Sequence, residues 1–507
     1  MATALNGSSQ PVSLGLGYAL RTPGWRGSAD LHTGGAATTR SAMRGLDDGM
    51  NALERALRET RVDEVRQVEL VLQPSPAPGG GTARAATTSS EIELEVPHAG
   101  DDYGQLVLSI DDAGALRWHL PEADPPDPRL STTRGAGRVK RFRIPADTEQ
   151  PPEPPGGAGT QRSVFGVVGR RLLKVLVYPL TDPIVGAVTE AFARQWESQK
   201  RPYRLRKFTP ADYQGADATL PSAEELAALA AAGPVLLFIH GTFSTAHGGF
   251  GDLPPETMVR LHERYGGRVL AFDHPTLGVD PRANADWLVQ RLPPGGIELD
   301  IVSHSRGGLV ARVLAETQCS SGSTPAVAKV RRVVFVAAPN NGTLLADPDH
   351  IVNMIDRLTT LLALFPTGPV TEMLEALITA VKVIGHGGLK GLDGLASMRP
   401  DGRFLGTLNG PGSSAGDYFA IAANYSPTDK GLRGLVAQGA DLAVDRVFGN
   451  AANDLVVPTD GVFQKNGNAR FPLADSQRLV FAPADGVMHT TLFRHPRVSE
   501  RLLAWLG

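Results

Sequence analysis

A serine flanked by small residues is the first feature of this sequence that could do chemistry. The run Ser-His-Ser-Arg-Gly-Gly at residues 303–308 lies between two apolar stretches. In a strand that turns sharply into a helix, the residues two before and two after the exposed serine must be small, because strand and helix nearly touch there. Ser305 as the nucleophile meets this condition with Ser303 and Gly307, whereas Ser303 as the nucleophile would have the bulky Ile301 two residues before it. The pattern therefore favours Ser305.

These residues resemble the nucleophile elbow of the α/β-hydrolase superfamily, Gly-x-Ser-x-Gly, with Ser303 in place of the first glycine. Residues 239–244 read Ile-His-Gly-Thr-Phe-Ser and are similar to the oxyanion loop of lipases and esterases. The segments 338–343 and 398–409 are also similar to stretches found in lipases. The resemblance covers residues 233–507 and implies a serine hydrolase that acts on carboxylic esters.

The resemblance also implies where the oxyanion of the tetrahedral intermediate binds. Two backbone N–H groups stabilise this oxyanion in such enzymes. They would belong to Thr242 and to Arg306, the residue after the nucleophile. His240 would then stabilise the loop and would not be the base, so we favour a buried histidine with satisfied hydrogen bonds at this position.

In the superfamily the acid and the base follow the serine along the chain, with the acid first. After residue 400 the sequence contains only His489 and His495 of its 12 histidines. His489 follows the last apolar run, at the position expected of the base. His495 lies at the start of a terminal helix and is expected at the surface. We therefore predict that His489 is the base.

Asp454 is the predicted acid, in a segment that reads Asn-Asp-Leu-Val-Val-Pro at residues 453–458. This segment resembles the Asn-Asp-x-x-Val-Pro loop of many bacterial lipases. By the resemblance, the carboxylate holds the imidazole in the required tautomer and stabilises its cation. Asp460 is the main rival, and Asp441 and Asp445 are weaker ones. A plain turn residue is the structural alternative for Asp454.

A scaffold in residues 234–507 must bring these groups together. Apolar runs without a polar face alternate there with helical stretches such as 283–291 and 308–316, a pattern typical of a parallel sheet covered on both sides. The expected strands are 235–239, 268–272, 297–302, 333–337, 418–422 and 478–481. The predicted fold class is α/β, an α/β-hydrolase fold with a mostly parallel sheet.

An insertion at residues 344–396 lies where lipases carry a lid. Apolar residues in it recur at helical spacing and give one helix a continuous apolar face. They are Val370, Met373, Leu374, Leu377, Ile378 and Val381. Two interpretations stay open: a helical lid over an apolar acyl pocket, or a helix packed on the core.

Four segments are expected before this domain. Residues 1–61 are predicted to be poorly ordered apart from one helix. Residues 62–146 alternate apolar and polar side chains, which indicates a small β-rich accessory domain. Proline and glycine dominate 147–161, the composition of a linker. Residues 162–232 are predicted to be a helical connecting segment.

Composition and charge exclude several other classes of protein. Lys and Arg number 50 against 53 Asp and Glu, so no positive excess attracts nucleic acid. Spacings typical of metal ligands and phosphate-binding loops are missing, and we expect no metal and no cofactor. Prolines, glycines and charges interrupt the apolar runs, which predicts no transmembrane helix, while a basic amphipathic stretch leaves peripheral membrane contact open. The single Cys319 and a start without a signal-peptide pattern favour a cytoplasmic location.

The sequence thus predicts a carboxylic ester hydrolase of the lipase or esterase type, with a small-molecule ester or a lipid as substrate. Two alternatives stay open. One is a non-catalytic interaction protein built on a hydrolase scaffold. The other is an acyltransferase or thioesterase, because the choice of acceptor depends on the shape of the pocket.

Overall fold

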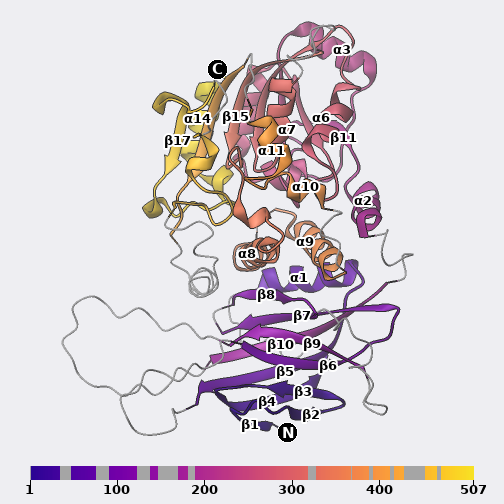
Figure 1. The fold of residues 1–507 in the computed structure, drawn as a ribbon. Helices are drawn as coiled ribbons and strands as arrows, with labels where there is room; N and C mark the ends of the chain where they lie inside the picture. The colour runs from indigo at the N-terminus through magenta and orange to yellow at the C-terminus, as the bar shows by residue number, and fades with distance from the viewer. Residues whose placement is uncertain are drawn as a thin grey trace, which may run out of the picture. The chain divides into compact units, whose positions relative to one another are not determined.

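Two compact units make up the protein (Figure 1). Met1–Pro183 belong to the N-terminal unit, and Ile184–Thr428 with Ala443–Gly507 form the C-terminal unit. The computed structural model describes residues 2–34, 47–75, 91–112, 114–122, 138–146, 169–180, 189–317, 327–366, 368–386, 392–410, 416–426, 451–464 and 470–507. The predicted linker 147–161 lies outside these residues.

The N-terminal unit contains two antiparallel sheets with an apolar core formed by residues of both. The six-stranded sheet has the order β1 (Thr3–Asn6), β4 (Trp25–Thr33), β5 (Asp63–Pro74), β10 (Gly169–Pro179), β7 (Tyr103–Asp111) and β8 (Leu116–His119). The four-stranded sheet has the order β2 (Val12–Gly15), β3 (Tyr18–Arg21), β6 (Glu91–Pro97) and β9 (Val139–Pro145). Helix α1 spans Asp47–Glu59. Strands β5 to β9 lie within residues 62–146, and residues such as Leu94 and Phe142 are fully buried there.

Two predictions for this part of the chain differ from the structure. Residues 1–61 were predicted to be poorly ordered, yet β1 to β4 lie within them, and Leu20 and Trp25 enter the core. Three of these strands have only four residues each, too few for an alternating pattern to stand out. The segment 162–232 is not purely helical, because it contains β10, which buries residues on both faces and therefore shows no period of two.

The C-terminal unit is built on a seven-stranded, mostly parallel sheet. Its order is β11 (Arg204–Lys207), β13 (Val269–Asp273), β12 (Val235–Ile239), β14 (Ile297–His304), β15 (Ala328–Val336), β16 (Asp417–Ala423) and β17 (Arg478–Phe481). Only the pairing of β11 with β13 is antiparallel. The six expected strands are confirmed as β12 to β17. Sequence reasoning missed β11, an edge strand of four residues, three of them basic.

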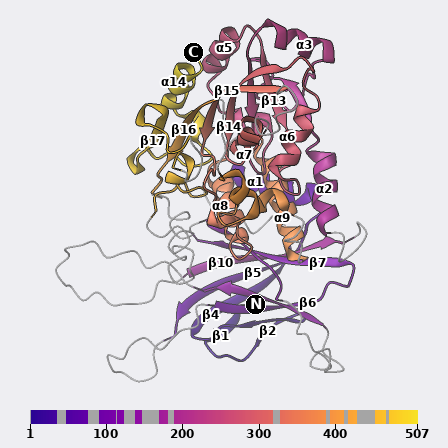
Figure 2. The same ribbon diagram turned by 45° about the horizontal axis from the view of Figure 1, so that its top comes forward.

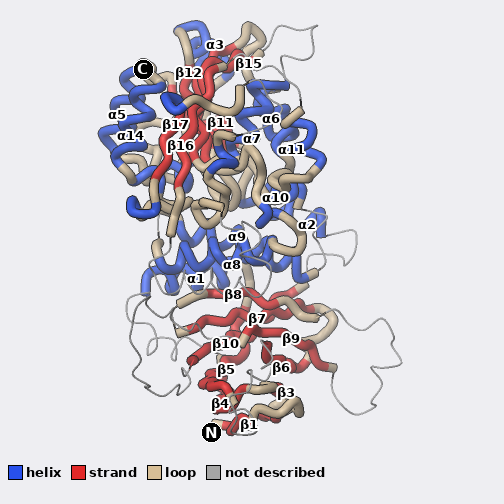
Figure 3. The backbone as a smooth tube through the Cα atoms, turned by 60° about the vertical axis from the view of Figure 1, so that its left-hand side comes forward, coloured by secondary structure: helices blue, strands red, loops and turns tan. Residues whose placement is uncertain are grey.

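Helices cover both faces of this sheet, as an all-buried parallel sheet requires. In Figure 3, α5 (Pro255–Arg264) and α14 (Pro496–Trp505) lie on one face, and α6 (Pro281–Val289) and α7 (Gly307–Arg312) lie on the other. A π-helical turn, Val313–Thr317, continues α7. The further α-helices of the described residues are α2 (Thr189–Lys200), α3 (Ala223–Ala232), α4 (Ala246–Phe250), α8 (Ile351–Leu364), α9 (Val370–Gly385), α10 (Asp393–Ala396) and α11 (Arg403–Leu408).

Helices α8 and α9 occupy the insertion predicted at 344–396. Figure 2 shows them together at one end of the strands of the C-terminal sheet. The apolar face predicted for α9 is present, with Leu374, Leu377, Ile378 and Val381 buried. Within the described ranges, no helix is both long and apolar enough to span a membrane.

A buried ion pair connects α7 to the π-helical turn that follows it. The guanidinium of Arg312 is fully buried and contacts Glu316 with Nε to Oε1 at 2.8 Å and Nη2 to Oε2 at 3.1 Å. Tyr418 donates to the same carboxylate at 2.8 Å, and Asn409 accepts from Arg312 at 2.8 Å. Removing one partner of such a pair leaves the other charge buried and uncompensated.

Glu316→Gln is therefore expected to lower the free energy of unfolding by about 3 kcal/mol. The control Glu298→Gln breaks a solvent-exposed contact of 2.6 Å with Lys329 and should cost less than about 1 kcal/mol. Chemical denaturation followed by circular dichroism measures both. Equal losses in the two variants would contradict the role given to the buried pair.

Candidate active site

Ser305 occupies a strained turn between β14 and α7. Its φ is 50°, a left-handed conformation that costs energy for a residue with a side chain. The turn is held by two backbone hydrogen bonds, from the N–H of Ser305 to the carbonyl of Val336 at 2.9 Å and from the N–H of Gly308 to the carbonyl of Ser305 at 2.9 Å. The hydroxyl is thus carried on a fixed backbone at the start of a helix.

Small residues are needed beside this turn because other backbone lies against it. A Cβ atom at Gly307 would lie 2.3 Å from the carbonyl oxygen of Ile239, and one at Gly308 would lie 2.4 Å from Cβ of Ala338. Ser303 is fully buried and its hydroxyl donates to the carbonyl of Val334 at 3.2 Å, inside the sheet. Ser303 therefore acts as a small sheet residue, while Ser305 reaches the pocket described next.

A small, largely apolar pocket brings Ser305 and His489 together. Its cavity volume is about 40 Å³, room for a few water molecules rather than for an ester. Its lining comes from segments far apart in the sequence and consists of Thr242, Ser244, Gly248, Gly249, Asp252, His304, Ser305, Met354, Leu358, Met373, Met398, Val456, His489, Thr490 and Phe493. Three of the predicted site residues thus line one pocket: Thr242, Ser305 and His489.

Asp454 lies behind the imidazole of His489. The distance from Oδ2 of Asp454 to Nδ1 of His489 is 2.8 Å, and both side chains are buried. The other carboxylate oxygen accepts from the N–H groups of Val456 at 3.0 Å and Val457 at 2.7 Å. An ionised carboxylate only accepts hydrogen bonds, so the neutral His489 ring carries its proton on Nδ1 and keeps Nε2 free as an acceptor.

The rival residues are elsewhere. His495 accepts from the N–H of Arg497 at 3.2 Å at the start of α14, and its ring packs against Phe481 with centroids 4.5 Å apart. Asp460 is exposed on a short turn. Asp441 and Asp445 lie outside the described residues.

The predicted oxyanion loop lies directly against Ser305. A Cβ atom at Gly241 would lie 2.6 Å from Cβ and 3.3 Å from Oγ of Ser305. The next residues are Thr242, in the pocket lining, and Phe243, which has a φ of 61°. The N–H of Phe243 donates to Oγ1 of Thr276 at 3.3 Å, which helps to hold this strained loop.

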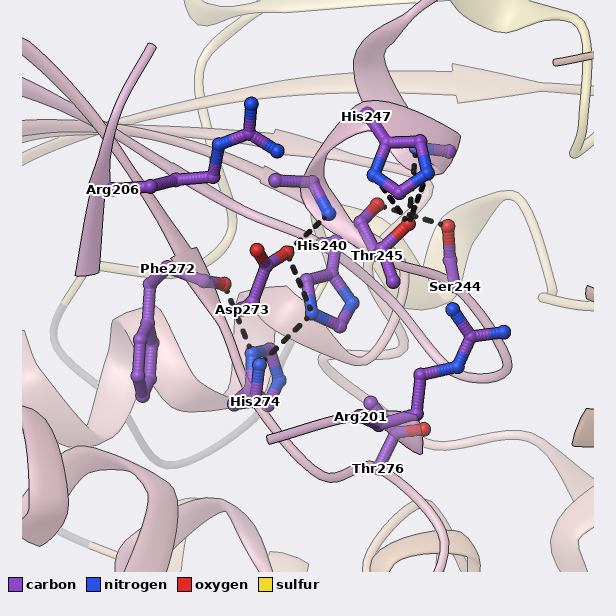
Figure 4. A network of polar contacts seen from close by, with 12 residues as sticks. Arg201, Arg206, His240, Ser244, Thr245, His247, Phe272, Asp273, His274 and Thr276 are labelled. Atoms are coloured by element: carbon purple, nitrogen blue, oxygen red, sulfur yellow. Dashed lines mark hydrogen bonds and ion pairs between the residues drawn. The ribbon is translucent and has the colours of Figure 1, made fainter. Parts of the chain in front are cut away.

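His240 supports the loop, and Figure 4 shows its ring beside Asp273 and His274. Its Nδ1 donates to the carbonyl of Gly241 at 2.9 Å, and its Nε2 accepts from the N–H of His274 at 3.1 Å. The two imidazoles stack with centroids 4.2 Å apart. Burial lowers the pKa of His240 to about 4 and holds the pKa of His274 well below its usual value, so both rings are neutral. This geometry gives His240 a role in supporting the loop and none as a base.

Backbone strain marks the same end of the sheet. The described part of the C-terminal unit has four residues other than glycine with positive φ: Phe243, Ser305, Ala337 and Leu455. The first three follow the ends of β12, β14 and β15, and Leu455 follows Asp454. Strained backbone persists where the surroundings enforce it, and it concentrates at functional sites.

Sequence reasoning did not foresee the side chain of Arg306. It is fully buried and donates to the carbonyl of Gly394 at 2.8 Å and to Oδ1 of Asn284 at 3.1 Å. Nearby, the carboxylate of Glu197 accepts from the N–H groups of Leu277 at 2.7 Å and Gly278 at 2.9 Å. Burial raises the pKa of Glu197, and these N–H groups and the charge of Arg306 oppose that rise. No spacing in the sequence could have signalled these contacts, because they join segments that meet only in the fold.

No cluster of metal-ligating side chains occurs among the residues that the structure describes. The polar groups of the pocket include the hydroxyl of Ser305 and the imidazole of His489, and the loop of Thr242 supplies backbone N–H groups beside them. These can act as nucleophile, base and oxyanion donors.

The tautomer of His240 gives a direct test of this arrangement. At pH 5.5, where a free histidine is mostly cationic, nitrogen NMR of the His240 ring is expected to show a neutral ring with its proton on Nδ1. Because the folded protein binds this proton only near pH 4 while the unfolded chain binds it near pH 6.5, the contribution of His240 to stability falls as the pH drops through this window. A cationic ring at pH 5.5 would contradict the hydrogen bonds given above.

Solved structures with a detectable similarity include three named as lipolytic or ester-cleaving proteins. Phospholipase PlaB from Legionella pneumophila is 15% identical over 45% of each chain, with a TM-score of 0.30. Lipase 1 from Pelosinus fermentans is 12% identical over 53% of this chain and 98% of its own, with a TM-score of 0.31. A metagenomic carboxyl esterase is 16% identical over 57% of this chain and 79% of its own, with a TM-score of 0.26. The chain spans less than half the length of phospholipase PlaB.

No curated protein has a significant match to the sequence. Residues 200–507 match a protein family described as a domain of unknown function. This match covers the greater part of the 507 residues and includes all the site residues predicted above. The protein therefore belongs to the family described as Domain of unknown function (DUF7379).

Proposed function

We propose that the protein is a serine hydrolase that cleaves carboxylic esters, with Ser305, His489 and Asp454 as its catalytic triad. One observation carries the proposal: a strained serine and an imidazole line the same pocket, and a buried carboxylate holds the far nitrogen of that imidazole at 2.8 Å. Three chemically matched groups from separate loops are thus brought to one end of the sheet. We further propose that the domain is a member of the α/β-hydrolase superfamily.

In the first step, Oγ of Ser305 attacks the acyl carbon while Nε2 of His489 takes the hydroxyl proton. Asp454 stabilises the imidazolium that forms and keeps the ring oriented. His489 then donates the proton to the departing alcohol oxygen, and the acyl group stays on Ser305 as an ester. A water molecule, deprotonated by His489, attacks this ester and releases the acid.

The backbone N–H groups of Thr242 and Arg306 are proposed to stabilise the oxyanion. Neither of them donates a hydrogen bond to any residue in the described part of the chain. The contact of Gly241 with Ser305 places this loop beside the nucleophile, and Arg306 begins the helix that follows it. Each such donor contributes about 3 kcal/mol in comparable sites.

Helices α8 and α9 are proposed to form a lid over this site. They contribute Met354, Leu358 and Met373 to the lining, and the cavity of about 40 Å³ is too small for an ester unless the lining moves. The apolar lining favours an acyl chain, which makes a lipid-like ester the proposed substrate. Helix α9 also contacts α8 and α2 of its own unit, so the two roles considered for this helix are compatible.

Ser305→Ala is expected to lower turnover of a p-nitrophenyl ester by at least about 10³-fold and to abolish labelling by a fluorophosphonate. Asp454→Asn should lower turnover by roughly 10³- to 10⁴-fold, because the His489 ring loses its preferred tautomer. The controls Ser303→Ala and Asp460→Asn should keep nearly full activity. If Ser305→Ala hydrolyses the ester as fast as the wild type, the assignment is wrong.

The contacts of Glu372 at the start of α9 give a second test, directed at the lid. Glu372 contacts Nη1 of Arg201 at 3.0 Å and Nε2 of His247, in α4, at 3.3 Å. Glu372→Gln removes the charge that holds α9 in place and is expected to raise turnover of long-chain esters about fivefold relative to short-chain ones. Asp393→Asn, which breaks an exposed pair with Arg194, is the control. An unchanged chain-length preference in Glu372→Gln would argue against the lid.

A further inference from the structure

His304, the residue before the nucleophile, lines the pocket but has no part in the steps above. Its Nε2 lies 3.2 Å from the backbone carbonyl oxygen of His489. Its ring also faces that of His489, with centroids 5.1 Å apart and planes inclined by 38°. The last residue of β14 thus contacts both the backbone and the side chain of the proposed base.

The hydrogen bond determines the tautomer of His304. A carbonyl oxygen can only accept, so Nε2 of His304 carries the proton. Nδ1 of His304 is buried and has no hydrogen-bond partner among the described residues. Burial, with a smaller effect of nearby His489, lowers the pKa of His304 to about 3. The ring therefore stays neutral when His489 becomes cationic, and it donates one hydrogen bond throughout the reaction.

Aromatic side chains also pack against the His304 ring. Phe493 meets it edge to face with centroids 5.5 Å apart. Phe493 in turn contacts Phe250 at 5.1 Å, and Phe250 contacts Phe238 of β12 at 4.9 Å. Phe250, Phe238 and Phe493 belong to the apolar core of the C-terminal unit. His304 thus packs against a ring that is anchored in the apolar core.

We propose that His304 is a positioning residue, which holds the loop of His489 at the correct distance from Ser305 through its Nε2–H bond to the His489 carbonyl. The inference rests on the proposed function. His304 and Ser305 are adjacent in the chain, so the hydrogen bond ties the base to the backbone that carries the nucleophile. Small displacements of a catalytic group cost up to about 10²-fold in rate, which gives such a tie a measurable effect.

The test compares three replacements of His304. His304→Gln can still donate from its terminal amide, whereas His304→Phe keeps a ring without the donor and His304→Asn is too short to reach. His304→Phe and His304→Asn are expected to lower kcat and the rate of fluorophosphonate labelling by about 10- to 100-fold, with KM changed less than about threefold. His304→Gln should stay within about threefold of the wild type in all three quantities.

His495→Phe is the matched control, since it makes the same exchange at a histidine that packs on Phe481 outside the pocket. It should label at the wild-type rate. Circular dichroism shows which variants fold. If His304→Phe does not fold, His304→Asn takes its place in the comparison.

Two outcomes would overturn the inference: wild-type labelling of folded His304→Phe or His304→Asn, or equal losses in His304→Gln and His304→Phe. Failure of the proposed function is distinguishable from these. In that case the wild-type protein itself is not labelled at Ser305. If the wild type is labelled and His304→Phe reacts equally fast, only the positioning role of His304 is contradicted.

Discussion

The close approach of two backbone segments at Gly307 is the constraint on which the proposed site depends. The start of α7 passes so near the end of β12 that a single Cβ at Gly307 would meet the carbonyls of Ile239 and His240 at 2.3 and 2.5 Å. Only glycine fits, and the turn that makes this approach possible forces Ser305 to positive φ. The same approach brings the loop after β12 against Ser305. The close approach at Gly307 thus places the proposed nucleophile and the proposed oxyanion loop side by side.

Burial and pairing then separate the roles of the histidines. His240 and His304 are held neutral because burial disfavours a charge on either ring, and in His240 this effect outweighs the carboxylate of Asp273, 3.9 Å from Nε2. His489 differs because Asp454 accepts a hydrogen bond from its ring at 2.8 Å. A carboxylate in this position favours the cation that a base must become. The proposed roles of the three imidazoles therefore rest on their burial and on the hydrogen bond between His489 and Asp454.

The sequence allowed accurate prediction where a local pattern is long or sterically strict. The buried runs of the parallel sheet were located closely, and β12 was predicted with the bounds Val235–Ile239 that the structure shows. The turn at Ser305 was recognisable because small residues are compulsory there. Short strands such as β1 and β11 were missed, since four residues give too little periodicity. The contacts of Arg306 and His304 depend on loops that meet only after folding, so no local sequence pattern could predict them.

A crystal structure of the protein inhibited by a phosphonate ester would test the central claim most directly. The account predicts phosphorus bonded to Oγ of Ser305, one phosphoryl oxygen about 2.7–3.1 Å from the backbone nitrogens of Thr242 and Arg306, and Nε2 of His489 facing Oγ. An adduct on another residue, or a phosphoryl oxygen that points away from both nitrogens, would contradict it.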